Sequence, residues 1–197
     1  MPSATSGTCR PVAKYLALLR GVNVGGVVLK MEDFKSVLEY IGFTKVRTYI
    51  QSGNALFESD DDNKRRMEAS ISGELKAKIG REVAVIVKTI PELRRIAELH
   101  PLAGLGDPDK LYVTFLSYDP AKEDMETLME TMNDIDRHEV AHRVVYSYYG
   151  AGYGNSKRSN NFIEKILKVS ATTRNWETVN KLLDLAMEKD DGRKRLQ

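Results

Sequence analysis

The sequence predicts an α+β fold built from two ferredoxin-like subdomains, each of the split βαβ type. Three observations predict this fold. Short apolar or β-branched runs alternate with longer segments of helical periodicity. Over residues 12–88 the expected order is strand, helix, strand, strand, helix, strand, which is the split βαβ pattern. From Leu111 the same order returns without a closing strand, so we expect the second subdomain to be altered or permuted.

The first subdomain is expected to hold four strands and two helices. The apolar run Val12–Arg20 ends at Gly21, which is typical of a buried strand. Apolar residues then recur at helical spacing from Met31 to Ile41, and Gly42 is typical of the residue after a helix. The remaining expected elements are strands at 45–50, 54–58 and 83–87, and a helix that ends near Ile79 and is capped by Ser59 or Asp60.

The second subdomain is expected at residues 89–188, with an extra helix at its C-terminal end. Its first helix begins at Thr89 and Glu92, which have the spacing of a capping box. Residues 1–11 and 189–197 are expected to be flexible tails. The other expected elements are strands at 111–116, 139–141 and 144–149, and helices at 120–132, 159–169 and 174–187.

Composition favours a soluble globular protein and excludes several classes of function. Hydrophobic residues make up 42% of the 197 residues, and charged residues make up 29%. The net charge of +2 is too balanced to indicate DNA wrapping or binding to a membrane surface. No apolar stretch approaches the roughly 20 residues that span a bilayer. The one cysteine, Cys9, cannot form an internal disulfide, so we expect a cytoplasmic location.

The most informative stretches are LLRGVNVGG at 18–26 and QSGN at 51–54. In a split βαβ unit the first two strands run parallel, and the third is expected beside the first. The two stretches should therefore meet at one end of the first sheet. Their glycines allow backbone N–H groups to approach a ligand closely, and the forked Arg20 guanidinium adds a positive charge. The expected ligand-binding residues are Arg20, Gly21, Asn23, Gly25, Gly26, Gln51, Ser52, Gly53 and Asn54.

This pattern predicts the binding of a small anionic ligand, either phosphate-bearing or nucleotide-like. The spacing is neither the G-x-G-x-x-G of dinucleotide-binding proteins nor a P-loop, so we expect neither site. The same residue types also suit turn geometry alone. The alternative function is a non-catalytic protein–protein or RNA-binding module. RNA is the less favoured partner, because the strand at 54–58 lacks the aromatic pattern of an RNA-recognition module.

A second glycine and amide cluster, GAGYGNSKRSNN at 150–161, precedes a predicted helix. Basic residues at the start of a helix oppose its dipole unless an anion lies nearby, which mildly favours ligand binding. Trp176 also has the helical spacing of a core residue. The secondary candidates for ligand binding are Lys157, Asn160, Asn161, Arg174, Asn175 and Trp176.

No persuasive catalytic constellation is present in the sequence. It has no G-x-S-x-G elbow and no Cys–His pairing, so we assign no catalytic residue and leave enzymatic activity open. His138 and His142 have the spacing of metal ligands on a helix, but they fall in an expected hairpin. We therefore expect no metal site, and the pattern identifies no cofactor.

Four motifs together resemble a bacterial family of unknown function, DUF1697. They are LLRGVNVGG, RTYIQSGNALF, GYGNSK and ATTRNWETVNKLL, in the order found in that family, and the resemblance extends from Lys14 to Ala186. It implies a pair of ferredoxin-like subdomains and no particular reaction, and it strengthens the expectation that the first two motifs bind a ligand. Beyond the residues already named, the resemblance carries over to Gly152, Gly154, Ser156, Thr172 and Thr173.

Overall fold

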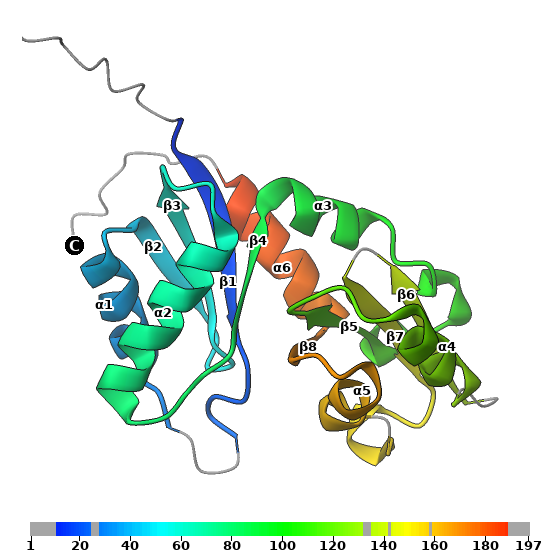
Figure 1. Ribbon diagram of the computed structural model, residues 1–197. Coiled ribbons are helices and arrows are strands. Elements are labelled where there is room, and N and C mark those ends of the chain that lie inside the picture. Colours follow the sequence, from blue (N-terminus) through cyan, green and yellow to red (C-terminus); the bar gives the residue numbers. More distant parts are fainter. Residues whose placement is uncertain (1–10, 25–27, 132–134, 142, 158, 189–197) are drawn as a thin grey trace, which may run out of the picture.

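A computed structural model describes residues 11–24, 28–131, 135–141, 143–157 and 159–188. Within these ranges the chain forms two α+β units in sequence, joined by two short 3₁₀ turns (Figure 1). The first unit consists of β1 (Ala13–Leu19), α1 (Met31–Ile41), β2 (Thr44–Tyr49), β3 (Asn54–Ser59), α2 (Lys64–Ile79), β4 (Val85–Thr89) and α3 (Ile90–Glu98). The turns η1 (Ala103–Leu105) and η2 (Pro108–Lys110) follow. The second unit consists of β5 (Leu111–Leu116), α4 (Lys122–Glu130), β6 (Asp136–Ala141), β7 (Val144–Tyr149), η3 (Tyr153–Asn155), α5 (Asn160–Leu167), β8 (Ala171–Asn175) and α6 (Trp176–Met187).

Each unit contains one four-stranded antiparallel sheet with the ferredoxin-like strand order. The first sheet runs β2-β3-β1-β4, and the second runs β6-β7-β5-β8. In both sheets the first strand is central and pairs antiparallel with the third and fourth strands. The predicted pair of ferredoxin-like subdomains is therefore confirmed.

The second unit is complete, which corrects the expectation of an altered or permuted copy. The stretch ATTRN forms β8, the closing strand, and α6 begins only at Trp176, after the N-cap Asn175. β-Branched Thr172 and Thr173 favour a strand. Sequence reasoning missed this strand because it buries Arg174 and Thr172 in place of apolar residues, so no hydrophobic alternation marks it.

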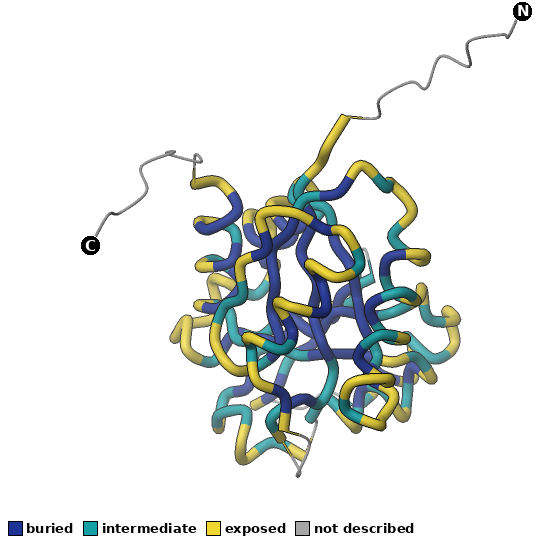
Figure 2. The backbone as a smooth tube through the Cα atoms, turned by 90° about the vertical axis from the view of Figure 1, so that its left-hand side faces the viewer, coloured by how far each residue is buried: buried dark blue, intermediate teal, exposed yellow. Residues whose placement is uncertain are grey.

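Three apolar clusters hold the structure together. In β1, Ala17 and Leu19 belong to the cluster under α1 and α2, whereas Leu16 and Leu18 face the second unit. Figure 2 shows a buried centre surrounded by exposed outer segments. The middle cluster joins both sheets with α3 and α6, which pack against each other. The two units therefore share the middle cluster, and the expected division at residues 88 and 89 stays a prediction.

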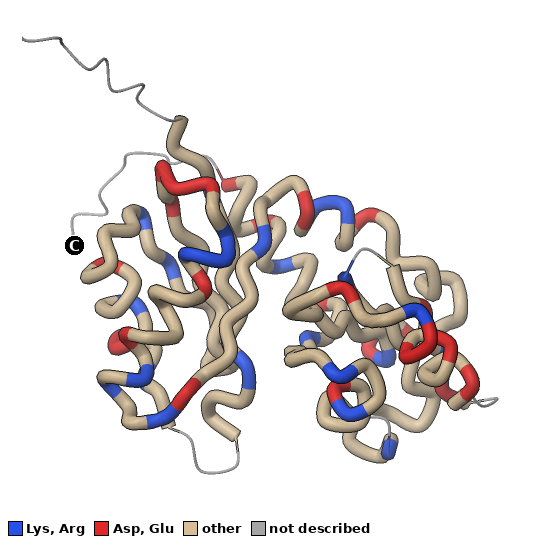
Figure 3. The backbone as a smooth tube through the Cα atoms, viewed as in Figure 1, with Lys and Arg blue, Asp and Glu red and all other residues tan. Residues whose placement is uncertain are grey.

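The two units have the same order of elements along the chain. Both run β-α-β-β-α-β-α, and the last helix of each begins directly after a capping residue at the end of the fourth strand, Thr89 or Asn175. The predicted capping box of Thr89 and Glu92 is confirmed. No described helix is long and apolar enough to cross a membrane. Figure 3 shows both signs of charge dispersed over both units.

Candidate functional site

The end of β1 and the β2–β3 turn lie side by side, as the sequence predicts. The backbone N–H of Leu19 donates to the carbonyl of Gly53 at 2.8 Å. The side-chain amide of Asn23 donates to the carbonyl of Gln51 at 2.6 Å. Strand pairing of β1 with β3 produces this contact, because it places the exit from β1 beside the turn that enters β3.

Asn23 fixes the loop after β1 through three hydrogen bonds. Besides Gln51, its amide nitrogen donates to the Leu29 carbonyl at 2.9 Å, and its amide oxygen accepts from the Leu29 N–H at 2.8 Å. Asn23 has a φ of 56°, a conformation that asparagine tolerates better than most residues. Its side chain therefore closes the loop and is not free for a ligand. Gly25 and Gly26, which we expect to bind a ligand, lie outside the described residues.

Arg174 of the second unit reaches into this corner of the first unit. The side chain is only 7% exposed, and all its guanidinium nitrogens donate hydrogen bonds at 2.6–3.0 Å. Burial lowers the pKa of Arg174 to about 10. Every acceptor is a neutral oxygen: Asn54 Oδ1, Thr172 Oγ1 and the carbonyls of Leu19, Ser52 and Thr173.

Asn54 shows why the QSGN stretch has its composition. The Asn54 side chain is fully buried, and its amide nitrogen donates to the Tyr49 carbonyl at 3.0 Å and to Ser52 Oγ at 2.9 Å. Its oxygen is then oriented to accept from Arg174 Nε at 2.6 Å. Asn54 therefore joins the turn of the first unit to β8 of the second unit.

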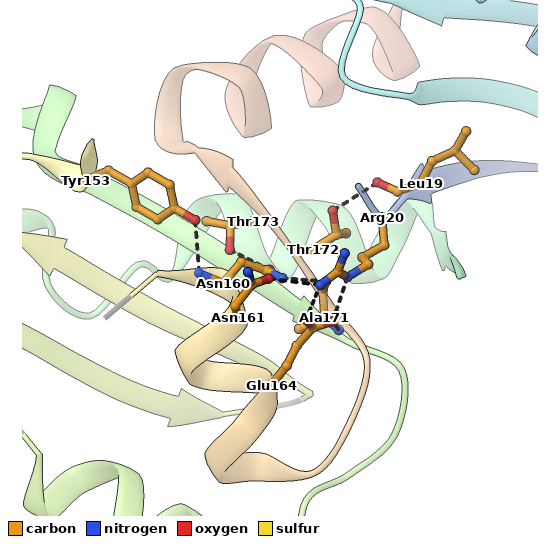
Figure 4. A network of polar contacts seen from close by, with 9 residues as sticks. All are labelled: Leu19, Arg20, Tyr153, Asn160, Asn161, Glu164, Ala171, Thr172 and Thr173. Atoms are coloured by element: carbon orange, nitrogen blue, oxygen red, sulfur yellow. Dashed lines mark hydrogen bonds and ion pairs between the residues drawn. The ribbon is translucent and has the colours of Figure 1, made fainter. Parts of the chain in front are cut away.

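Thr172, Thr173 and Asn160 extend this hydrogen-bond network through the second unit (Figure 4). Thr172 Oγ1 donates to the Leu19 carbonyl at 3.0 Å. Thr173 Oγ1 donates to Asn160 Oδ1 at 2.9 Å, and the backbone N–H of Asn160 donates to the Tyr153 hydroxyl oxygen at 3.1 Å. The GYG and SNN segments therefore connect to β8 through Asn160.

Arg20 makes an ion pair within the chain, which corrects the expectation of a guanidinium free for an anion. Its Nε and one terminal nitrogen donate to the Glu164 carboxylate at 3.0 and 2.6 Å, and the terminal nitrogen also donates to Asn161 Oδ1 at 2.9 Å. The hydrogen bond to Glu164 raises the pKa of Arg20. Glu164 also accepts from the N–H of Ala171 at 2.7 Å, so this carboxylate is held by β8.

We call these residues the Arg174 junction: Leu19, Arg20, Asn23, Gln51, Ser52, Gly53, Asn54, Tyr153, Asn160, Asn161, Glu164, Thr172, Thr173 and Arg174. It brings together residues from all four motifs. Two arginines and one carboxylate meet among these residues, so the junction carries one excess positive charge at neutral pH.

The remaining secondary candidates lie beside the junction. Asn175 caps α6, because its side-chain oxygen accepts from the Thr178 N–H at 3.0 Å. Trp176 packs edge-on against His100, with 4.6 Å between the ring centroids, and also lines a cleft of about 520 Å³ with Tyr49. Lys157 is exposed. No group of three or more potential metal-ligating side chains is present among the described residues.

Sequence reasoning did not identify Tyr153 or Glu164 as members of the junction. One signal for Glu164 was available, since residues three apart on a helix share a face and Glu164 lies three residues after Asn161. Its partner Arg20 lies 144 residues away, on the other unit, so the pair depends on how the units pack.

Comparisons with known proteins agree with this architecture. A solved structure described as the conserved bacterial protein SP0830 from Streptococcus pneumoniae matches with a TM-score of 0.68 and 20% sequence identity. The match covers 90% of this chain and 100% of that chain, and it shows a shared fold. No curated protein matches the chain significantly. The model of a family described as a protein of unknown function, DUF1697, matches residues 12–146, so the chain belongs to this family.

Proposed function

We propose that the protein binds a small anionic ligand, phosphate-bearing or nucleotide-like, at the solvent-exposed edge of the Arg174 junction. One observation carries the proposal: Arg174 is buried, and no carboxylate is among its described hydrogen-bond partners. A cytoplasmic location, expected from the lone Cys9, suits such a ligand.

The charge of Arg174 makes an anion favourable at this edge. Neutral oxygens satisfy the guanidinium N–H groups, but they do not compensate the charge that burial removes from water. The Arg20–Glu164 pair is internally balanced, which leaves the Arg174 charge in excess. All N–H groups of the Arg174 guanidinium already donate hydrogen bonds, so Arg174 attracts an anion only through the electrostatic field of its positive charge. Other groups must therefore make the direct contacts with the ligand.

Exposed polar side chains at the same edge can make those contacts. Gln51 is exposed, and its described hydrogen bond uses only its backbone carbonyl. Asn161 is exposed, and its described contact uses its amide oxygen and leaves the nitrogen to donate. Tyr153 accepts through its hydroxyl oxygen and can donate its proton, and exposed Lys157 lies four residues further along the chain. These groups suit phosphate oxygens and the polar edges of a nucleotide.

A thermal-shift screen tests the proposal. The screen contains AMP, ATP, a sugar phosphate, citrate and a short RNA, each compared with sodium chloride at matched ionic strength. A ligand of the native state raises the melting temperature in a saturable manner. We expect at least one small organic phosphate to do so. A response to RNA alone, weakening steeply with salt, would favour the RNA-binding alternative, and no response would contradict both.

Changing Arg20 to alanine is expected to diminish the response to the organic phosphate. The substitution leaves the Glu164 carboxylate without its guanidinium partner, so the excess positive charge of the junction falls to zero. The measurement is the melting temperature with and without ligand, with Lys122→Ala as the control because Lys122 has an 82% exposed side chain at the start of α4. An undiminished response in Arg20→Ala would show that the site is elsewhere.

A further inference from the structure

The internal repeat contains a second junction that is equivalent to the first. Arg174 precedes the capping residue of α6 and pairs with Val113 of β5. Lys88 precedes the capping residue of α3 and pairs with Leu16 of β1. Lys88 therefore occupies in the first unit the position that Arg174 occupies in the second.

The turns opposite these two residues are also equivalent. The Gly53 carbonyl accepts from the last N–H of β1 at 2.8 Å, and the Arg143 carbonyl accepts from the last N–H of β5 at 3.0 Å. Both turn residues have positive φ, 77° for Gly53 and 61° for Arg143. An arginine side chain therefore stands at the second junction where the first has a glycine.

The second junction lacks the side-chain acceptor that Asn54 offers to Arg174 at the first junction. Asn54 pairs with Leu18 and accepts from Arg174, whereas the equivalent residue, Val144, pairs with Phe115 and has no polar side chain. Lys88 is only 3% exposed, and its ammonium group has no hydrogen-bond partner among the described residues. A buried ammonium without an acceptor is costly, so this position calls for an explanation.

Two further buried donors are unsatisfied beside Lys88. Among the described residues, Arg143 Nε and the Ser117 hydroxyl have no hydrogen-bond partner. Arg143 is tied to Ser117 because its terminal nitrogen donates to the Ser117 carbonyl. The repeat places Lys88 opposite the Arg143 turn as Arg174 lies opposite the Gly53 turn, and the positive charge of Arg143 helps to lower the pKa of Lys88. The Lys88 ammonium, Arg143 Nε and the Ser117 hydroxyl are therefore three donors at the second junction that have no hydrogen-bond acceptor among the described residues.

The charges around Lys88 leave one cation in excess. Lys64, Lys88 and Arg143 are positive, and Glu68 and Glu92 are negative. Glu92 is engaged by Lys64 at 2.6 Å, and Glu68 accepts from the Val87 N–H at 2.8 Å. Neither carboxylate accepts a hydrogen bond from Lys88 among the described residues, so the ammonium group still lacks an acceptor.

We propose that Lys88, Arg143 and Ser117 form a second anion site, which takes a small tetrahedral oxyanion such as inorganic phosphate or a terminal phosphate group. An ammonium, a guanidinium N–H and a hydroxyl are the donors that such an anion accepts from in proteins. Its oxygens would supply the acceptor that Val144 does not. The site is separate from the Arg174 junction and does not depend on the function proposed there.

Phosphate binding to purified full-length protein tests this site. Inorganic phosphate, sulfate and glycerol phosphate are each compared with sodium chloride at equal ionic strength, by calorimetry and by melting temperature. We expect saturable binding of phosphate to the wild type and at least a tenfold loss of affinity in Lys88→Met. Glycerol phosphate distinguishes a free ion from a phosphate group on a larger molecule.

Three further variants make the result decisive. Ser117→Ala removes only a hydroxyl and should weaken binding, which keeps the test valid if Lys88→Met does not fold. Lys122→Met, which removes a lysine with an 82% exposed side chain, should bind as the wild type does. Arg20→Ala should also retain phosphate binding, because it alters only the first junction. The proposal would be overturned if Lys88→Met and Ser117→Ala both bound phosphate as tightly as the wild type does. It would also be overturned if the wild type did not bind phosphate.

The pH dependence of stability gives a separate check on Lys88. Burial lowers its pKa to about 8, with Glu92 and Glu68 opposing the shift and Arg143 and Lys64 adding to it. In the unfolded chain the pKa of lysine is about 10.4. Between these two pH values the unfolded state binds more protons at Lys88 than the native state does. The free energy of unfolding of the wild type should therefore rise from about pH 8 to about pH 10, relative to that of Lys88→Met. Added phosphate should diminish this rise, because the anion favours the protonated ammonium. Identical pH profiles for the two proteins would contradict the conclusion that Lys88 is buried without a hydrogen-bond partner.

Discussion

Replacing Arg174 with methionine is expected to lower the free energy of unfolding by about 3–5 kcal/mol, because removing one partner from a buried polar network strands the others. The guanidinium satisfies acceptors on both units, including Asn54 Oδ1, which would remain buried without this donor. For a chain of this size, such a loss corresponds to a fall in melting temperature of roughly 2–4 °C per kcal/mol. Urea unfolding followed by circular dichroism measures the effect.

The matched control is Arg81→Met, which removes an exposed arginine and should change the free energy of unfolding by no more than about 0.5 kcal/mol. A double variant locates the effect at the junction. In Arg174→Met with Asn54→Leu, the orphaned amide oxygen is removed together with its donor, so the combined loss should be smaller than the sum of the single losses. Strict additivity, or a loss under about 1 kcal/mol for Arg174→Met, would show that the network does not hold the units together.

Replacing Gly53 with alanine is expected to cost about 2–4 kcal/mol, from backbone strain and overpacking together. Gly53 has a φ of 77°, and an added Cβ would lie 2.6 Å from Val22 Cγ2 and 2.7 Å from Leu19 Cβ. The strained residue would disturb the contact between the β2–β3 turn and the end of β1. The measurement is again equilibrium unfolding.

Gly73→Ala provides the opposite outcome with the same chemical change. Gly73 lies on the exposed side of α2, and an added Cβ there would meet nothing within 4 Å. Alanine favours a helix over glycine by about 0.5–1 kcal/mol, so this variant should be more stable than the wild type. If Gly53→Ala were also more stable than the wild type, this result would show that the turn does not approach Val22 and Leu19 closely.

Much of the fold follows from local pattern in the sequence. The helical spacing from Met31 to Ile41 and the capping box at Thr89 have local causes, and both are confirmed. The meeting of LLRGVN with QSGN also follows, because the topology of a split βαβ unit fixes which turns share an end of the sheet. These predictions depend only on interactions within one unit.

Features that depend on packing between the units could not be predicted from the same patterns. β8 was missed because Arg174 and Thr172 are buried against polar groups of the first unit, so polar residues occupy inward positions. The ion pair between Arg20 and Glu164 could not be predicted either, because only the packing of the two units brings Glu164 to Arg20. The burial of Lys88 could not be predicted from the sequence either, since a lysine in a strand is usually exposed. A search for equivalent positions in the two repeats would have aligned Lys88 with Arg174 once β8 was recognised.

The most direct test of ligand binding at the Arg174 junction is an amide proton–nitrogen correlation spectrum of the protein titrated with AMP. We expect saturable shifts concentrated at Ser52, Asn161 and Arg174, which lie far apart in sequence and meet at the junction. The same titration of Arg20→Ala should give diminished shifts at these amides. No shifts in the wild type, or shifts confined to the cleft lined by Tyr49 and Trp176, would contradict the account.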